Sequence, residues 1–199
     1  MLAAFYLASA ILVDSKSNST EGHIMSKYLG DEWRHRKDEL TVKFLQETDY
    51  QLTEKDQQAV DRAKELIQRV YKYKKCHLAS CGLFGSGSFK HGTHIYCRRL
   101  HEFSQCAEAR VIERAHWSDL IGNPDTLLTL ATFHGSHNGN GDRIGEPYLI
   151  SPCPKCLRLL EQEAPDCLVV VDLLGDGRLA KVPLEAVDFF RHPKDHNGG

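Results

Sequence analysis

The chain has 199 residues, which is enough for one sizeable domain with an extension. Hydrophobic residues make up 41% of the sequence and charged residues 26%, as in an ordinary globular protein. The formal net charge is −2. A protein whose main task is to grip nucleic acid needs a basic surface, so this charge argues against that class of function.

The N-terminus joins an apolar run to a polar stretch. Leu2–Val13 has the length of a signal-peptide core but is too short to cross a membrane comfortably, and no Lys or Arg precedes it. Met25, after the polar stretch, is a second candidate start. We therefore expect residues 1–24 to be a disordered or signal-like leader, and we expect no membrane partner.

The seven cysteines are odd in number and irregularly spaced, which is a poor basis for a set of disulfides. Thiols that bind a metal must stay reduced, which favours a cytoplasmic location. Secretion is the alternative, because of the apolar N-terminal run.

Hydrophobic spacing predicts alternating helices and strands after a helical extension at 25–52, within one domain at 53–192 that a loose tail at 193–199 follows. Thr53 is the expected N-cap of the clearest helix. The predicted elements, in chain order, are one helix or a broken pair at 26–47, a helix at 54–70, a hairpin of strands at 78–83 and 89–96, a helix at 107–116, a strand at 126–133, a helix at 153–163, strands at 167–173 and 178–182, and a short helix at 185–190. This order predicts an α/β fold in three layers, α/β/α, with a mixed sheet of about five strands.

Two short motifs carry the chemistry: Cys106-Ala-Glu108, and Pro152-Cys153-Pro-Lys-Cys156 further along the chain. Each falls at the start of a predicted helix, where the helix dipole lowers the pKa of a thiol. Cys153 and Cys156 are three residues apart, so both can reach one ion. Zinc takes thiolate ligands in tetrahedral geometry, and a catalytic site leaves its fourth position to water. The sequence thus predicts a zinc site of three cysteines.

Glu108 on its own would be an ordinary acid in the first turn of a helix, favoured by the dipole. Together with the downstream cysteines, it fits the signature of zinc-dependent base deaminases, in which this carboxylate moves protons and is not a ligand. The second motif on its own would fit a structural zinc half-site or a redox pair. A structural site needs a fourth ligand, and the placement of His101 fits no common pattern.

Three thiolates around a divalent ion leave a net negative charge, so the site needs cations or donors beside its sulfurs. Lys155, Arg158 and Arg110 are the candidates by position. The alternative for each is an ordinary solvated side chain on a helix surface.

Both motifs resemble the cytidine deaminase superfamily, and within it the blasticidin-S deaminases and the small tetrameric cytidine deaminases. The resemblance runs from about residue 56 to residue 190 and includes Leu78–Leu83 and Gly92–Tyr96. It implies the fold of that family, a zinc ion held by the three cysteines, and hydrolytic release of ammonia from C4 of a cytosine ring. It also implies proton transfer by Glu108, a backbone N–H of Ala107 that binds the pyrimidine carbonyl, and a homotetramer.

One stretch departs from the family pattern. Cytidine deaminases have Gly-x-Asn-x-Glu, whose Asn and Glu bind the ribose, whereas this chain has His94 and Tyr96 at those places. Tyr is typical of blasticidin-S deaminase-like sequences, and it lacks the acceptor-only carboxylate that suits a sugar diol. His77 takes the place of a substrate-contacting Ser. We expect His77, His94 and Tyr96 to contact a substrate that is either a nucleoside antibiotic or cytidine or deoxycytidine; the alternative for the histidines is a hydrogen-bonded strand end.

Two further functions stay open at this point. A deaminase of single-stranded nucleic acid would need a basic channel and stacking aromatic residues, and the sequence offers only short basic clusters at 72–75 and 98–99. A non-catalytic, zinc-stabilised binding protein would not need Glu108. A long loop at 134–146 precedes the second motif and is placed to cover the site.

Overall fold

The computed structural model describes residues 30–70, 77–94, 105–120, 125–135 and 145–191. The predicted leader at 1–24, the tail at 193–199, the two basic clusters, Tyr96 and most of the 134–146 loop lie outside these residues. The chain divides into two compact units, Met1–Glu39 and Leu40–Gly199. In the described part of the chain, no helix is long and apolar enough to cross a bilayer.

The helix predicted at 26–47 is α2, Gly30–Gln46, and it runs across the boundary between the units. In the first unit its side chains are mostly exposed, and Lys37 Nζ lies 5.9 Å from the centre of the Trp33 ring. In the second unit Phe44 is buried, with its ring edge-on to Tyr50 at 4.6 Å between centroids. A short 3-10 helix, η1, Thr48–Tyr50, follows α2.

Helix α3, Glu54–Val70, starts as the sequence predicts. The Thr53 hydroxyl accepts the backbone N–H of Asp56 at 3.2 Å, and the Asp56 carboxylate accepts the backbone N–H of Thr53 at 2.9 Å. This reciprocal cap satisfies donors that the first turn of a helix leaves unpaired. The buried stripe of α3 is Ala59, Val60, Ala63 and Ile67.

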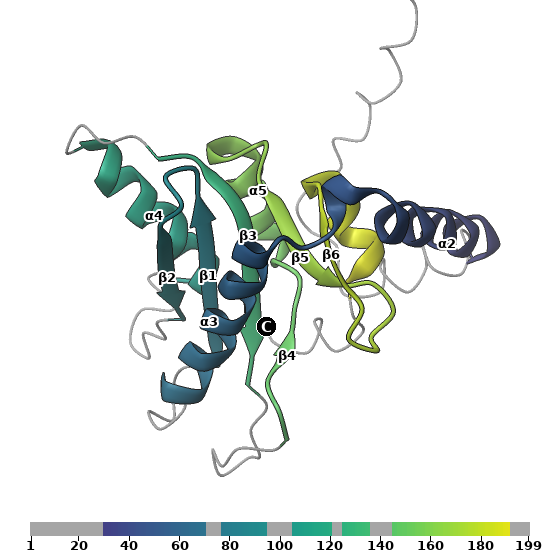
Figure 1. Cartoon of the computed structure of the whole chain (residues 1–199), viewed down its shortest axis with the longest axis horizontal. Helices are drawn as coiled ribbons and strands as arrows, with labels where there is room; N and C mark the ends of the chain where they lie inside the picture. The colour runs from purple at the N-terminus through teal and green to yellow at the C-terminus, as the bar shows by residue number, and fades with distance from the viewer. Residues whose placement is uncertain (1–29, 71–76, 95–104, 121–124, 136–144, 192–199) are drawn as a thin grey trace, which may run out of the picture. The chain divides into compact units, whose positions relative to one another are not determined.

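Within the described residues, six strands form one mixed sheet in the order β2-β1-β3-β5-β6, with β4 paired to the end of β3 (Figure 1). Only β3 and β5 run parallel, and the other pairs are antiparallel. The strands are β1 Leu78–Phe84, β2 Phe89–Thr93, β3 Leu127–His134, β4 Tyr148–Leu149, β5 Leu168–Asp172 and β6 Leu179–Val182. The predicted α/β class with a mixed sheet is therefore confirmed.

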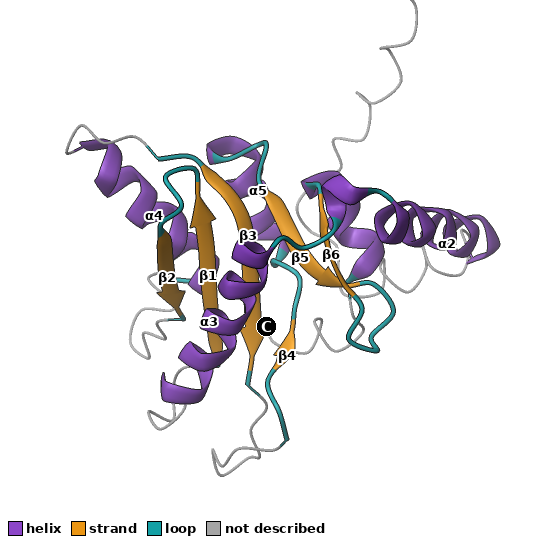
Figure 2. Ribbon diagram, viewed as in Figure 1, coloured by secondary structure: helices purple, strands orange, loops and turns teal. Residues whose placement is uncertain are grey.

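Helices cover both faces of the sheet, and each face has its own apolar core (Figure 2). Helix α3 covers one face, where Ile67 packs in a cluster with Ala79, Cys81 and Phe133. Helices α4, Ala107–Leu120, and α5, Pro154–Glu163, cover the other face. There Val111 of α4 and Leu160 of α5 share a cluster with strand residues such as Leu130. The three-layer arrangement places the starts of α4 and α5 on the same side of the sheet.

Four elements differ from the sequence prediction. Strand β2 ends at Thr93, three residues before its predicted end. Helix α4 continues to Leu120, four residues beyond its predicted end. Residues 148–149, for which no element was predicted, form strand β4, because they pair with the last two residues of β3. The final helix is a 3-10 helix, η3, Leu184–Phe190.

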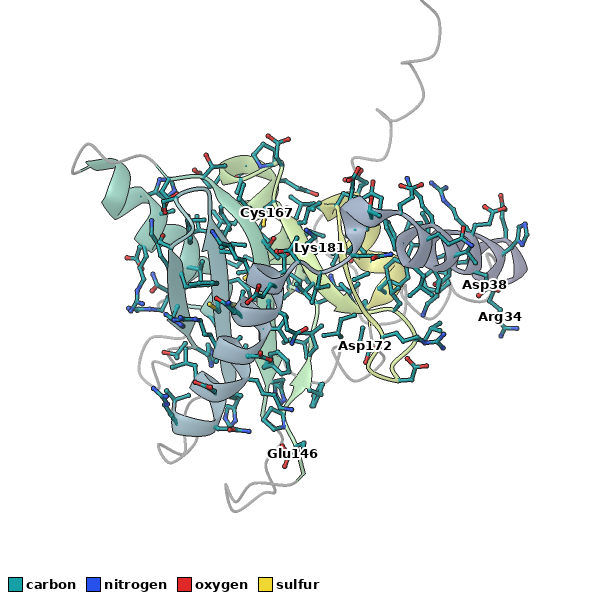
Figure 3. All side chains as sticks on the ribbon, viewed as in Figure 1. Arg34, Asp38, Glu146, Cys167, Asp172 and Lys181 are labelled. Carbon is teal, nitrogen blue, oxygen red and sulfur yellow. The ribbon has the colours of Figure 1, made fainter. Side chains whose placement is uncertain are left out.

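A long-range ion pair ties α3 to the far edge of the sheet. The ammonium of Lys181 on β6, labelled in Figure 3, lies 2.8 Å from the carboxylate of Asp56. Thr129 of β3 donates to the other oxygen of the same carboxylate at 2.7 Å. Both charged side chains are largely buried, so this carboxylate has hydrogen bonds in place of water.

Candidate metal and catalytic site

Three cysteine sulfurs meet where α4 and α5 begin. Cys106 directly precedes α4, Cys153 is the N-cap of α5, and Cys156 lies in the first turn of α5. Their Sγ atoms all lie within 4.8 Å of one another, and those of Cys106 and Cys153 are 3.9 Å apart. The residues that the sequence predicts as zinc ligands are therefore brought together by the fold, as free thiols.

The sulfur geometry and the chemistry of the donors both fit a zinc ion. Tetrahedral zinc with Zn–S bonds of about 2.3 Å sets its sulfurs about 3.8 Å apart. The pKa of Cys153 is lowered because its sulfur accepts hydrogen bonds from the Cys106 and Cys156 thiols and from the backbone N–H groups of Cys156 and Lys155. The same hydrogen bonds raise the pKa values of the two donor thiols. A divalent cation would replace the protons that these sulfurs share.

Glu108 lies in the first turn of α4, next to the three sulfurs. Its side chain is 2% exposed, and its Oε2 accepts from the Cys156 thiol at 3.8 Å. Burial raises the pKa of this carboxyl to about 7, and the negative Cys153 sulfur adds to the rise, while Arg191 acts in the opposite direction. A carboxyl group in such a place exchanges a proton near neutral pH.

The cations predicted to offset the negative charge of the sulfurs differ in how far they are buried. Lys155 and Arg158 are exposed on α5. Arg110 is half-buried, and its guanidinium donates to the side chain of Gln105 at 3.4 Å. Arg191, which no motif in the sequence pointed to, follows η3, and its charge acts on Glu108. Its guanidinium is 9% exposed and is held by Asp188 at 2.7 Å.

Gly92 and Ala107 show how closely the sheet approaches the start of α4. Gly92 is buried on β2, and a Cβ at that position would collide with the Ala107 carbonyl oxygen. Side chains alternate along an extended strand, so the side chain of His94, two residues later, points to the same face of the sheet as the Gly92 hydrogen that contacts α4. The backbone contact thus places the end of β2 beside the start of α4, which Cys106 directly precedes.

Two predicted substrate residues lie together at the ends of neighbouring strands. His77 precedes β1, and His94 follows β2 with its backbone N–H bonded to the Leu78 carbonyl at 3.0 Å. His134 pairs with Leu78 from the other side. The His77 and His134 rings are 6.3 Å apart and nearly parallel, and His134 lies 5.2 Å from the Tyr148 ring. We call His77, His94, His134 and Tyr148 the strand-end cluster.

Burial and electrostatics distinguish the members of this cluster. The pKa of His94 is lowered first by burial and then by the nearby His77. His94 is therefore neutral around pH 7, able to donate from one ring nitrogen and accept at the other. Tyr96, the remaining predicted substrate residue, lies outside the described residues.

Comparison with known proteins finds similarity to the same family that the two motifs resemble. No family model matches the chain. The blasticidin-S deaminase of Bacillus cereus is 28% identical to it over 138 residues, which are 68% of this chain and 91% of that protein. The crystal structure of the cytidine deaminase from Bacillus anthracis matches with a TM-score of 0.51 and 16% identity, over 71% of this chain and 91% of that one. The chain has the cytidine deaminase fold.

A further match is the cytidine deaminase from Burkholderia pseudomallei, with a TM-score of 0.47 and 16% identity over 68% of this chain and 96% of that one. The predicted resemblance to the cytidine deaminase family is thus confirmed, by sequence for the blasticidin-S deaminase and by fold for the B. anthracis structure. In this cytidine deaminase-like chain, the three cysteines form a cluster that fits a zinc site.

Proposed function

We propose that this protein is a zinc-dependent aminohydrolase that removes the exocyclic amino group of a cytosine ring as ammonia. The substrate class is a cytosine-containing nucleoside or nucleoside antibiotic. The observation that carries this proposal is the meeting of three sulfurs and a buried carboxyl group at two helix starts. The similarity to blasticidin-S deaminase supports the same chemistry.

Cys106, Cys153 and Cys156 would hold the zinc ion, which, when bound, supplies a Lewis acid for the activation of water. The helix starts help, because their backbone N–H groups favour the charged form of a sulfur. Arg191, whose charge acts on Glu108, and the half-buried Arg110 of α4 are our candidates to offset the excess negative charge.

Glu108 is the group that would move protons. Its carboxylate would take one proton of the attacking water and pass it to ring N3, and would then take the remaining proton of the new C4 hydroxyl and pass it to the departing amine, which leaves as ammonia. One buried carboxyl group can serve both relays, because each donation returns it to the carboxylate form that accepts the next proton. The backbone N–H of Ala107, the first residue of α4, would bind the pyrimidine carbonyl and so set the ring against Glu108.

The strand-end cluster would contact the sugar side of the substrate. Neutral His94 can both donate to and accept from a hydroxyl, which a carboxylate cannot do. We extend the predicted pair of His77 and His94 with His134 and Tyr148, because the structure groups their rings. We expect the cytoplasm as the location and a homotetramer as the assembly, which light scattering tests.

The test is ammonia release by zinc-loaded protein from cytidine, deoxycytidine and blasticidin S, with Glu108→Gln as the inactive control. Turnover of blasticidin S alone would assign an antibiotic-detoxifying activity, and turnover of the plain nucleosides would assign pyrimidine salvage. A protein that binds one zinc ion per chain but releases ammonia from none of the three would count against the proposed substrate class. Tight, salt-sensitive binding of an oligonucleotide would favour single-stranded nucleic acid instead.

A further inference from the structure

A hollow lies at the β2 edge of the sheet, and none of the three cysteines of the proposed zinc site lines it. It is a groove of about 790 Å³ between α3 and α4, with β2 as its floor. Figure 1 shows β2 as the edge strand, with α3 on one side of it and α4 on the other. This volume is in the range of sites for small organic molecules.

Positive side chains from both walls surround one histidine of the floor. Arg62 and Arg69 come from α3, and Arg114 comes from α4. The pKa of His91 is lowered by burial and then by all three arginines, so the field at the floor is positive. Arg62 is fixed in place, with its guanidinium carbon 4.4 Å from the centre of the Phe89 ring.

Two acids also line the groove, and each has a partner on its own helix. Glu65 lies 3.5 Å from the guanidinium of Arg69, and Asp61 accepts from the side chain of Gln57 at 2.9 Å. Three guanidinium groups thus face two carboxylates, which leaves the lining positive. Neither acid is among the groups that shift the pKa of His91, whereas all three arginines are.

The strand adds backbone donors. The backbone N–H of His94 bonds to the Leu78 carbonyl on β1, so hydrogen bonding along β2 alternates from that point. The N–H groups of His91 and Thr93 therefore point away from β1, out of the edge of the sheet. Both residues line the groove. Backbone N–H groups beside guanidinium forks are the donor set that proteins use for phosphate oxygens.

We propose that this groove binds a small phosphorylated molecule of about nucleotide size, through its phosphate group. The phosphate lies over His91 and Thr93, between the arginines of the two walls. The organic part rests on Leu66 and Val70, the apolar side chains of the α3 wall. The proposal is independent of the deaminase activity, because it uses neither the cysteines nor Glu108.

The experiment is a calorimetric titration of the full, zinc-loaded chain with inorganic pyrophosphate and with adenosine diphosphate. We expect saturable binding of at least one of them, with one site per chain. Arg62→Gln and Arg114→Gln should each weaken it by about tenfold, the usual effect of losing one charged hydrogen-bond partner. Arg178→Gln, an exposed arginine that precedes β6 and lies outside the groove lining, is the matched control and should bind as the wild type does.

Several outcomes would overturn the proposal. Absence of saturable binding of both phosphates would do so. An equal loss of binding in the Arg178→Gln control would also do so, because it would show that general surface charge causes the binding. Binding of citrate or poly-glutamate alone would replace the phosphate with a carboxylate ligand or an acidic peptide. A change of mass in light scattering for Arg62→Gln, without phosphate binding, would mean that a second copy fills the groove.

One variant needs a check of its own, since Arg62 also packs on Phe89. The unfolding temperature of Arg62→Gln is compared with that of the wild type. Arg69→Gln, whose side chain is exposed and makes no such stacking contact among the described residues, then serves as the independent groove variant. If Arg62 and Arg69 can both be replaced without weakening the binding of pyrophosphate, the groove is not the phosphate site.

Discussion

Asp56 and Glu108 are two carboxyl groups in the first turns of two helices, and each is 2% exposed. Asp56 is surrounded by donors: Thr53, Thr129 and Lys181 all bond to it. Burial alone would raise its pKa, but these hydrogen bonds outweigh burial and lower it. Glu108, in the same kind of position, accepts hydrogen bonds from its own backbone N–H and from the weak S–H donor of Cys156; burial outweighs both, and its pKa rises to about 7.

The difference teaches what each carboxyl group is suited for. A buried carboxylate with a full set of donors stays charged and joins the elements that supply those donors. A buried carboxyl group with few donors holds its proton loosely around neutral pH and contributes little to the cohesion of the fold. We therefore expect Asp56 to serve stability and propose that Glu108 serves chemistry, and the two should respond in opposite ways when each is replaced by its amide.

The largest effect should come from Glu108→Gln. We expect ammonia release to fall by about 10²- to 10⁴-fold, the usual contribution of a general acid and base, with little change in the unfolding temperature. The measurement is turnover per folded, zinc-loaded chain. Asp56→Asn is the matched control and should keep its turnover per folded molecule. Equal activity in Glu108→Gln and wild type would remove Glu108 from the chemistry.

Cys153→Ser should come next, because it removes the sulfur whose pKa is lowered by hydrogen bonds from the Cys106 and Cys156 thiols and from backbone N–H groups at the start of α5. Zinc affinity should fall by at least about 100-fold, since even losing a group behind a ligand can cost that much. Metal content by atomic emission, after dialysis against a chelator, measures it. Cys167→Ser changes a buried thiol on another element and should retain one zinc ion per chain. Loss of zinc from both variants would point to unfolding instead.

Asp56→Asn should lower the free energy of unfolding by about 3 kcal/mol, because it leaves the Lys181 ammonium buried without its carboxylate. Urea unfolding followed by circular dichroism gives the value. Asp176→Asn breaks an exposed pair with Arg178 and should leave the curve unchanged. If the two variants behave alike, the buried network does not hold α3 to the sheet.

The smallest effect is a dependence on pH. The pKa of Asp56 in the folded protein lies below its usual 3.8, so its contribution to stability is complete above the unfolded pKa and is lost as pH falls through the folded pKa. The gap in unfolding free energy between wild type and Asp56→Asn, both metal-free, should be constant above about pH 5 and shrink below pH 3.8. A gap that persists unchanged to pH 3 would contradict the lowered pKa.

Local pattern was enough to predict the start of α3 and the cysteine site. Thr53 and Asp56 are three residues apart, as are Cys153 and Cys156, so helix geometry alone determines how each pair is placed. The motif that contains Cys106 could be linked to the second one because both fall at helix starts. The α/β class followed from the alternation of helices and buried strands.

Contacts between distant strands could not be predicted in this way. Lys181 meets Asp56, and His134 meets His77, only because the sheet places β1 and β3 side by side and carries β5 and β6 beyond them. Periodicity within a segment does not encode that order. Strand β4 has two residues, too few for an alternating pattern, and the groove beside β2 is formed by three elements whose packing no single segment reveals.

Gly92 and Gly145 make opposite demands on a residue that would replace them. A methyl group at position 92 would collide with the carbonyl oxygen of Ala107, whereas at position 145 it would meet nothing within 4 Å. Among the described residues, the restriction on a side chain at Gly145 comes from its φ of 75°, which asparagine tolerates at small cost. In a library that tries all twenty amino acids at each position, selection for metal-loaded protein should retain only glycine at position 92 and several amino acids at position 145.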